Sequence, residues 1–461
     1  MMQFTESAAP APPHYSSGFP GLCLDLAAAG GANGGAVRSR PWPDLPSSVK
    51  SLGSYNAACM EQLLVHCANA IESNDATLAQ QILWVLNNIA PPDGDSNQRL
   101  TAAFLRALIV RASRSGSASC AALASAMASV AAAPSHPSVA AADPSLRLSA
   151  VSLAGFIDLT PWHRFGFSAA NAAIAEAVEG FQVIHIVDLS TTHSMQLPTL
   201  IDSLAGRPDG PPFIRLTVPC FDGNSPPPLL DMPLDELGSK LVNFARSRNV
   251  GMEFRAVPSS PTDGLQSMIE QLRVQQLING HETEALIINC HMMLHRIPDE
   301  SAGASIPSPR TAFLKSLRSL DPTLVVVVDE DADFTAGDVV GRLRAAFNYM
   351  WIPFDAVETF LPVGSEQRRR YEAAVGWKIE NVIAQEGVGR VERLETRGRW
   401  VQRMRGAGFH GGGFGEEAAA EVKGMLDEHS AGWGMKRDED DLVLTWKGHD
   451  VVFASAWLPS F

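Results

Sequence analysis

The residues best placed to carry chemistry lie between Val183 and Leu200, in the segment VIHIVDLSTTHSMQLPTL. An apolar run from Val183 to Val187 ends at the carboxylate of Asp188, and a polar loop then separates it from a helical pattern. This order is typical of the first β-α unit of a nucleotide-binding α/β domain. The loop has no glycine between Asp188 and Ser194, although the backbone must approach a bound nucleotide closely there. The segment favours the fold but argues against the nucleotide, so we predict no cofactor.

Three polar side chains in this segment could act as site residues. Asp188 either caps the loop by accepting backbone N–H bonds or faces a ligand or partner, and capping is the commoner use of such a carboxylate. His185 alternates with Ile184 and Ile186, so a buried, hydrogen-bonded histidine is favoured over a catalytic base. His193 lies in the loop and is the better candidate for an exposed contact.

Other chemical signals are weak. His291 and His295 have the i, i+4 spacing of a helical metal pair, but they follow a strand-like run and lack the glutamate and third ligand of a zinc site. The acidic run from Asp329 to Asp333 ends another strand-like run, where a solvated loop is the default expectation. We therefore predict no metal, no catalytic residue and no enzyme activity.

The charge balance restricts the partners. The formal net charge is −14, so the field of the whole chain repels nucleic acid and anionic membranes. Arg368, Arg369 and Arg370 form a local basic run that is a candidate nucleic-acid or nuclear-import contact. A second group of arginines, between 390 and 405, is interleaved with Glu392 and Glu395, which favours internal ion pairs. No apolar run reaches the ~18 residues of a membrane span, so no membrane association is expected.

The chain divides by composition. Residues 1–52 are rich in Ala, Pro, Gly and Ser without periodicity and are predicted to be a disordered arm. Residues 53–461 are predicted to fold. Helical periodicity over 60–71, 78–89 and 100–111 predicts a helical cap of about 54–115, to which we assign further elements near 146–180. The Ala/Ser-rich stretch 115–145 is either a weak helix followed by a loop or a partly disordered insertion.

From about 181 to 461 the pattern predicts an α/β core. Five apolar runs (183–189, 213–219, 252–257, 285–290 and 324–329) alternate with helical patterns near 195–205, 232–248, 262–278, 309–320 and 338–360. Continuous apolar runs between helices indicate a mostly parallel sheet that is covered on both faces. Asp441–Trp446 and Val451–Ala456 flank a short turn and predict a terminal antiparallel hairpin. The expected fold is therefore Rossmann-like, in the arrangement of a methyltransferase with a terminal hairpin, plus the N-terminal helical cap.

Several long segments, in order, resemble one family of plant regulatory proteins, the GRAS family, over roughly 54–461. Ile184, His185, Ile186, Val187 and Asp188 match its VHIID motif. Met60–Arg111, with Leu63-Leu64, and 232–272 resemble its two leucine-rich regions. Further similar segments are Pro161–Asn171, Pro309-Arg310, Arg342, Tyr349–Asp355, Asn381–Glu395, Trp400, Ala407–Phe409, Trp433, Trp446 and Ser455–Trp457. The loop Ser190–His193 is similar to that of the scarecrow-like branch.

The resemblance implies a regulator of transcription in plant development or signalling, located in the nucleus with the cytoplasm as a second location. Such a protein acts with other transcription factors, as homodimers or heterodimers with other GRAS proteins, and on promoter DNA directly or through partners. The resemblance makes Leu63, Leu64 and the His193 loop the candidate partner-binding residues. The alternative function is a small-molecule-binding or degenerate S-adenosylmethionine methyltransferase-like protein, because the crevice at the strand ends persists without chemistry.

Overall fold

A computed structural model of the chain describes residues 57–131, 146–221, 226–279, 284–299 and 307–460. The chain separates into Met1–Ser54 and Tyr55–Phe461, and all described residues belong to the second unit. The predicted disordered arm, 1–52, lies outside the described residues. Within them, no helix is both long and apolar enough to cross a bilayer.

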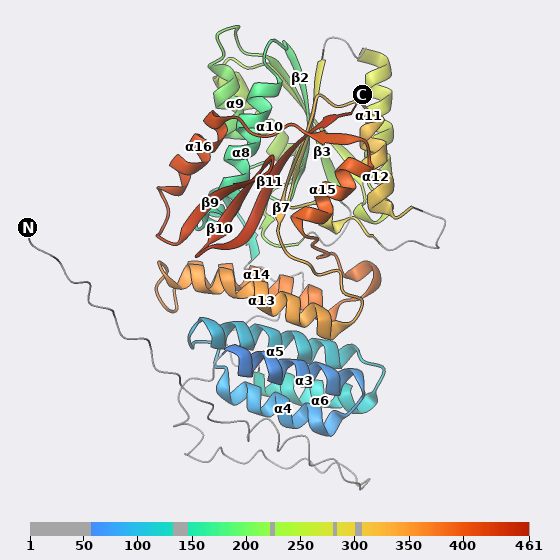
Figure 1. The fold of residues 1–461 in the computed structure, drawn as a ribbon, viewed down its shortest axis with the longest axis vertical. Coiled ribbons are helices and arrows are strands. Elements are labelled where there is room, and N and C mark those ends of the chain that lie inside the picture. The colour runs from blue at the N-terminus through green and yellow to red at the C-terminus, as the bar shows by residue number, and fades with distance from the viewer. Residues whose placement is uncertain (1–56, 132–145, 222–225, 280–283, 300–306, 461) are drawn as a thin grey trace, which may run out of the picture. The chain divides into compact units, whose positions relative to one another are not determined.

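A nine-stranded sheet organises the described residues, in the order β5-β3-β2-β6-β7-β11-β10-β9, with β8 beside β11 (Figure 1). The five strands from β5 to β7 in this order run parallel, whereas β11 pairs antiparallel with both β7 and β10. A small separate sheet pairs β1 with β4. The strands are β1 (Arg147–Leu148), β2 (Val183–Ser190), β3 (Phe213–Phe221), β4 (Leu229–Leu230), β5 (Met252–Ser259), β6 (Glu284–His291), β7 (Leu324–Glu330), β8 (Phe409–Gly411), β9 (Trp433–Asp438), β10 (Asp441–Trp446) and β11 (His449–Pro459).

The predicted fold class is confirmed, with an additional strand near the C-terminus. All five predicted parallel strands form, and the terminal hairpin is made by β10 and β11. Its turn is shorter than predicted, because β11 already begins at His449. Lys447 and Gly448 both have positive φ, 48° and 84°, as a two-residue turn that matches the twist of a hairpin requires. β9 adds a third antiparallel strand that the pattern did not reveal.

Helices cover both faces of the sheet (Figure 1). On one face, α11, α12 and α15 pack on alternate side chains of the central strands, among them Val187, Leu189, Val325 and Val327. On the other face lie α8, α9 and α16, and α10 packs on the edge strand β5. These helices are α8 (Pro161–Ala177), α9 (Leu197–Ala205), α10 (Leu234–Ser247), α11 (Gln266–Asn279), α12 (Pro309–Arg318), α15 (Arg397–Gly406) and α16 (Glu416–Leu426).

Gly166 lets α8 lie directly on the sheet. A Cβ at this position would stand 2.5 Å from Val328 Cγ1 and 2.7 Å from His291 Cε1, closer than carbon atoms can approach. The absence of a side chain therefore sets the spacing between this helix and the strands β6 and β7.

The helical cap is confirmed as α3 (Ala57–Glu72), α4 (Ala76–Ile89), α5 (Ser96–Arg114) and α6 (Ala118–Ala131). Asp75 and Asp95 cap α4 and α5, and Asp95 forms a capping box with Gln98, which satisfies otherwise orphaned N–H groups. Of the Ala/Ser-rich stretch, 118–131 is helix and 132–145 lies outside the described residues.

The predicted boundary between cap and core is wrong in two respects. α13 (Val339–Glu358) and α14 (Glu366–Ala384) pack against α5, between the cap and the sheet (Figure 1). Conversely, α8 packs on the sheet, and α7 (Ala150–Ile157) packs on α8, so the elements near 146–180 belong to the core. The helical layer is therefore built from two separate stretches of sequence, and helical periodicity does not encode which layer a helix joins.

Candidate functional site

The VHIID segment forms the centre of the sheet. Its five residues, Ile184, His185, Ile186, Val187 and Asp188, are all buried in β2 between β3 and β6. His185 Nε2 lies 2.9 Å from Thr217 Oγ1 on β3. Burial, with the nearby Arg215 and Arg255, lowers the pKa of His185 to about 4, so the ring is neutral at neutral pH. The prediction of a buried, hydrogen-bonded histidine is confirmed.

Asp188 holds the β2 loop through side chains rather than through the backbone. Its Oδ2 accepts hydrogen bonds from Ser190 Oγ at 2.9 Å and Ser194 Oγ at 2.6 Å, and its Oδ1 accepts one from Asn289 Nδ2 at 2.9 Å. Burial raises the pKa of Asp188, and these three donors oppose that rise. The prediction that Asp188 holds the loop is therefore supported, but its donors are side chains and not the predicted backbone N–H groups. One loop N–H, that of Ser194, instead donates to Ser190 Oγ.

The network continues away from Asp188. Asn289 Nδ2 also donates to Gln196 Oε1, Gln196 Nε2 donates to Asn171 Oδ1, and Asn171 Nδ2 donates to Thr199 Oγ1, each at 2.9–3.0 Å. Side chains thus join the ends of β2 and β6 to α8 and α9. They occupy the position at which a Rossmann enzyme holds its cofactor with glycines.

The residues beside this loop do not fit a nucleotide. The cavity that the loop lines measures about 50 Å³, against ~300–1,000 Å³ for typical small-molecule sites. His193 is half-buried rather than exposed, because its Nε2 accepts a hydrogen bond from the backbone N–H of Leu230 at 3.3 Å. The expectation of an exposed His193 therefore needs correction, since only part of this side chain reaches the surface.

A second group of charges meets at the carboxyl ends of β6 and β7. We call it the carboxyl-edge cluster, and it consists of His295, Asp329, Glu330, Lys378 and Glu392. His295 Nδ1 lies 2.8 Å from Asp329 Oδ1, and its Nε2 lies 3.2 Å from Glu392 Oε2. Lys378 pairs with Glu330 and with Glu392. Asp329 and Glu330 are buried, so the predicted solvated loop is wrong at these two residues.

The pairing in this cluster is reflected in its protonation. The two carboxylates beside His295 raise its pKa despite burial, and Lys378 and His295 lower the pKa of Glu392. Both effects favour the charged forms. The cluster is therefore a set of ion pairs, and Trp162 Nε1 adds a hydrogen bond to Glu330 Oε1 at 2.9 Å. His295 Nε2 and Glu392 Oε2 lie within ion-pair distance but outside hydrogen-bond geometry.

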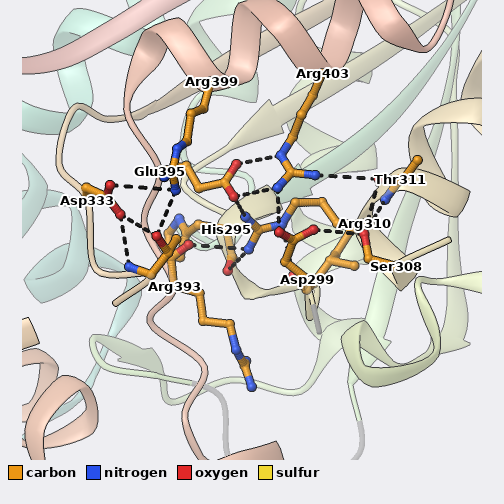
Figure 2. Close-up of polar contacts among 12 residues, drawn as sticks. His295, Asp299, Ser308, Arg310, Thr311, Asp333, Arg393, Glu395, Arg399 and Arg403 are labelled. Carbon is orange, nitrogen blue, oxygen red and sulfur yellow. Dashed lines mark hydrogen bonds and ion pairs between the residues drawn. The ribbon is translucent and has the colours of Figure 1, made fainter. Parts of the chain in front are cut away.

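A third group adjoins His295 through a hydrogen bond from Arg310, and Figure 2 shows it. We call it the Arg310 cluster, formed by Asp299, Ser308, Arg310, Glu395 and Arg403. Arg310 is fully buried and lies 3.0 Å from Glu395, while Arg403 makes two bonds of 2.6 Å to the same carboxylate. Arg310 also donates to the carbonyl of His295 at 2.7 Å and stacks over Trp400. The predicted internal ion pairs are confirmed for Glu395, which pairs with Arg403 of the same group and with Arg310. Glu392 pairs with His295 and Lys378, which lie outside that group.

The carboxyl-edge cluster lines a cavity of about 120 Å³, which we call the carboxyl-edge cavity. Its walls come from α7, α8, the loops after β2 and β6, and the helices α13 and α14. It therefore lies outside the carboxyl ends of the parallel strands, where open α/β sheets bind ligands. The apolar residues that line it include Phe156, Trp162, Met350, Tyr371 and Trp377.

The candidate partner-binding leucines are not on the surface. Leu63 and Leu64 are 6% and 0% exposed and face the interior of the helical cap. Helical spacing places them on the same buried stripe as Met60 and Cys67. The prediction that these two leucines contact a partner directly therefore needs correction, because neither side chain is exposed in the folded chain.

The basic run does not form one surface either. Arg368 is buried, with its guanidinium bonded to Glu372 and to the carbonyl of Leu361. Arg370 pairs with Glu366 one helical turn away, and Arg369 is exposed. The run lies on a helix, so consecutive residues point in different directions.

Three residues at the cavity were not anticipated from the sequence, namely Trp162, Arg296 and Lys378. Trp162 and Lys378 lie on the helices α8 and α14. There the apolar periodicity places them only at the edge of the buried face and names no contact. Arg296 directly follows His295 but precedes no recognisable motif. Trp162 and Lys378 acquire their roles from a partner distant in the sequence, Glu330.

The fold and the contacts of the VHIID strand define a Rossmann-like α/β protein whose first strand is followed by a loop without glycine. The family model described as the GRAS domain family matches residues 60–458, and this chain belongs to that family. The chain is 55% identical over 421 residues to scarecrow-like protein 32 of Arabidopsis thaliana, which covers 90% of this chain and 97% of that protein. The predicted scarecrow-like resemblance is thus confirmed.

More distant relatives include other plant regulators. Protein SHORT-ROOT of Arabidopsis thaliana is 33% identical, with 88% of this chain and 74% of that protein covered. The DELLA protein RGL3 of the same plant is 30% identical, over 91% and 74%. The crystal structure of SCL7 in Oryza sativa has the same fold, with a TM-score of 0.65 at 22% identity, covering 86% of this chain and 99% of that one.

Proposed function

We propose that this chain is a nuclear regulator of plant transcription that reaches promoters through protein partners and catalyses no reaction. Its family consists of plant regulatory proteins, which supports the regulatory role. The finer claim, that a partner carries the DNA contact, rests mainly on one observation. Of the three arginines that the sequence offers for nucleic acid, Arg368 is buried in an ion pair, Arg370 pairs with Glu366 on the surface, and Arg369 is exposed.

The engagement of these arginines can be followed individually. Arg368 bonds to Glu372, Arg370 to Glu366, and Arg403 to Glu395. An arginine that already pairs with a carboxylate gains little by contacting a phosphate, because it must first give up that pair. With a net charge of −14, the long-range field also opposes approach to DNA. A partner that supplies the positive charge removes both obstacles.

The absence of catalysis is supported by the site itself. The Asp188 carboxylate is used internally by Ser190, Ser194 and Asn289. His185 and His295 are likewise fixed by partners in the core. None of these groups is free to act on a substrate as a general acid or base, which requires contact with the reacting atom.

Two linked experiments test the proposal. The full chain, fused to a heterologous DNA-binding domain, should change the output of a reporter carrying that domain's site, whereas the unfused chain should leave the same reporter unchanged. In parallel, the tagged chain purified from plant nuclei should carry DNA-binding proteins with it. A fusion without effect, or purification free of DNA-binding proteins, would contradict the proposal.

A further inference from the structure

Arg296 is a buried cation, and two of its guanidinium nitrogens have no hydrogen-bond partner among the described residues. It ends the short 3₁₀ helix Leu294–Arg296 after β6 and is 5% exposed. Among the described residues, neither its Nε nor its Nη2 has a hydrogen-bond partner. Leaving a buried donor unsatisfied is costly, and charged donors are the costliest. A group with this environment is expected to have an acceptor.

The two unpaired nitrogens define the shape of that acceptor. Nε and Nη2 lie on one edge of the planar guanidinium, where their N–H bonds run side by side. A carboxylate accepts such a pair with its two oxygens, in the strongest common arrangement for this side chain. Thr192 adds a further donor, because its hydroxyl is also buried and without a partner among the described residues.

The neighbouring acids do not take this role. Glu330 and Glu392 line the same cavity, but they pair with Lys378 and His295. Burial lowers the pKa of Arg296 to about 10, and Glu392 and Asp329 oppose that shift through longer-range attraction without accepting its hydrogens. Because Coulomb energy falls with distance, an anion in contact with the guanidinium gains more from it than it loses to Glu392.

The surroundings of Arg296 define the rest of the ligand. Arg296 lines both the carboxyl-edge cavity and the smaller one beside the β2 loop. Apolar and aromatic residues line the carboxyl-edge cavity, among them Phe156, Trp162, Met350 and Trp377. The cavity thus combines hydrogen-bond donors with apolar surface, as a site for an amphipathic small molecule does.

We infer that the carboxyl-edge cavity binds a small carboxylic acid with an apolar body, whose carboxylate contacts Arg296 and Thr192. The volume of about 120 Å³ restricts the body to roughly one ring, since sites for drug-sized ligands begin at ~300 Å³. The apolar body contacts the aromatic wall from α7, α8 and α14. This site is independent of the proposed partner-borne DNA contact, so either can fail without the other.

Calorimetric titration of the full chain with sodium benzoate tests the inference. Benzoate should bind saturably at one site. Benzamide lacks the charge and should bind at least roughly tenfold more weakly than benzoate, because charge-assisted bonds are about twice as strong as neutral ones. Inorganic phosphate lacks the apolar body and should also bind at least roughly tenfold more weakly. Phenylacetate and cyclohexanecarboxylate extend the series to related acids.

Variants assign the binding to the cavity. Arg296→Met should reduce benzoate affinity at least roughly tenfold, and Met350→Trp, which places a larger side chain in the cavity lining, should abolish binding. Arg369→Met, an exposed arginine on α14, is the matched control and should bind as the unaltered chain does. Thr192→Val is the milder test if Arg296→Met fails to fold, as judged by near-ultraviolet circular dichroism, and should weaken binding several-fold.

Three results would overturn the inference. One is the absence of saturable binding for all three acids. Another is equal binding of benzamide or phosphate, which would remove the carboxylate requirement. The third is benzoate affinity unchanged in Met350→Trp and Thr192→Val, which would place the acid elsewhere on the chain.

Discussion

Glu392 and Asp329 contact the two opposite ring nitrogens of one histidine, His295, with Glu392 Oε2 3.2 Å from Nε2 and Asp329 Oδ1 2.8 Å from Nδ1. The imidazolium stabilises both acids at once, because its Nδ1 donates to Asp329 and its charge attracts Glu392. This arrangement connects the end of β7 with the segment after α14. A buried positive histidine is therefore part of the structural frame of the domain.

The stability of the protein should depend on pH through His295. Because the folded-state pKa of His295 is raised, its contribution is fully present below the unfolded value of ~6.5 and is lost as pH rises through the folded value. Urea unfolding should therefore show the largest stability difference between the unaltered chain and His295→Gln below about pH 6.5, with a smaller difference at higher pH. His66→Gln, at an exposed position of α3, is the control. A difference that stays constant across this range would contradict the ion-pair assignment.

Removing the charge of Glu395 should severely destabilise the domain. Glu395→Gln leaves the buried Arg310 and the partly buried Arg403 without their shared carboxylate, and breaking a buried pair costs about 3–5 kcal/mol. The measurement is the free energy of unfolding in urea. Glu417→Gln, an exposed acid on α16, should change it by less than ~0.5 kcal/mol. Equal effects of the two substitutions would show that the Arg310 cluster contributes no net stability.

Two glycines in helices should respond in opposite directions to alanine. Gly166→Ala introduces a methyl group where Val328 and His291 leave no space, which should cost about 1–3 kcal/mol. Gly155→Ala in α7 meets nothing within 4 Å and should gain up to ~1 kcal/mol from helix propensity. Thermal unfolding of both variants provides the comparison. A neutral Gly166→Ala would mean that α8 does not lie as close to the sheet as described.

Variants of the first leucine-rich region should lose partner binding because they lose the folded structure. Leu64 is 0% exposed, so Leu64→Asp buries a charge and should unfold the cap. Leu277→Asp, at a leucine of α11 that is 83% exposed, is the chemically matched surface change and should leave stability within ~0.5 kcal/mol. Circular dichroism and purification of nuclear partners should be measured on the same samples. A Leu64→Asp chain that is fully folded yet binds no partner would restore Leu64 as a direct contact.

The sequence predicted those features that depend on local pattern. Continuous apolar runs located β2, β3, β5, β6 and β7 to within about two residues, because strands covered on both faces have that composition. The burial of His185 followed from its alternation with Ile184 and Ile186. The terminal hairpin followed from its short turn.

What the sequence did not reveal depends on contacts between distant residues. Asp188 lies 101 positions from Asn289, and Trp162 lies 168 positions from Glu330, so no local window contains both partners. For the same reason, the buried state of Asp329 and Arg368 was missed, since charge alone predicts exposure. The placement of α13 and α14 in the helical layer also required the tertiary structure, because an amphipathic pattern does not name the surface it covers.

Selection from random-sequence DNA with the purified full chain at physiological salt shows whether partners carry the DNA contact. No motif should be enriched by the chain alone. Chromatin mapping of the tagged chain in plant nuclei should yield sites whose motif belongs to a co-purified DNA-binding protein. A motif enriched by the purified chain alone, with affinity that falls steeply as salt rises, would contradict the proposal.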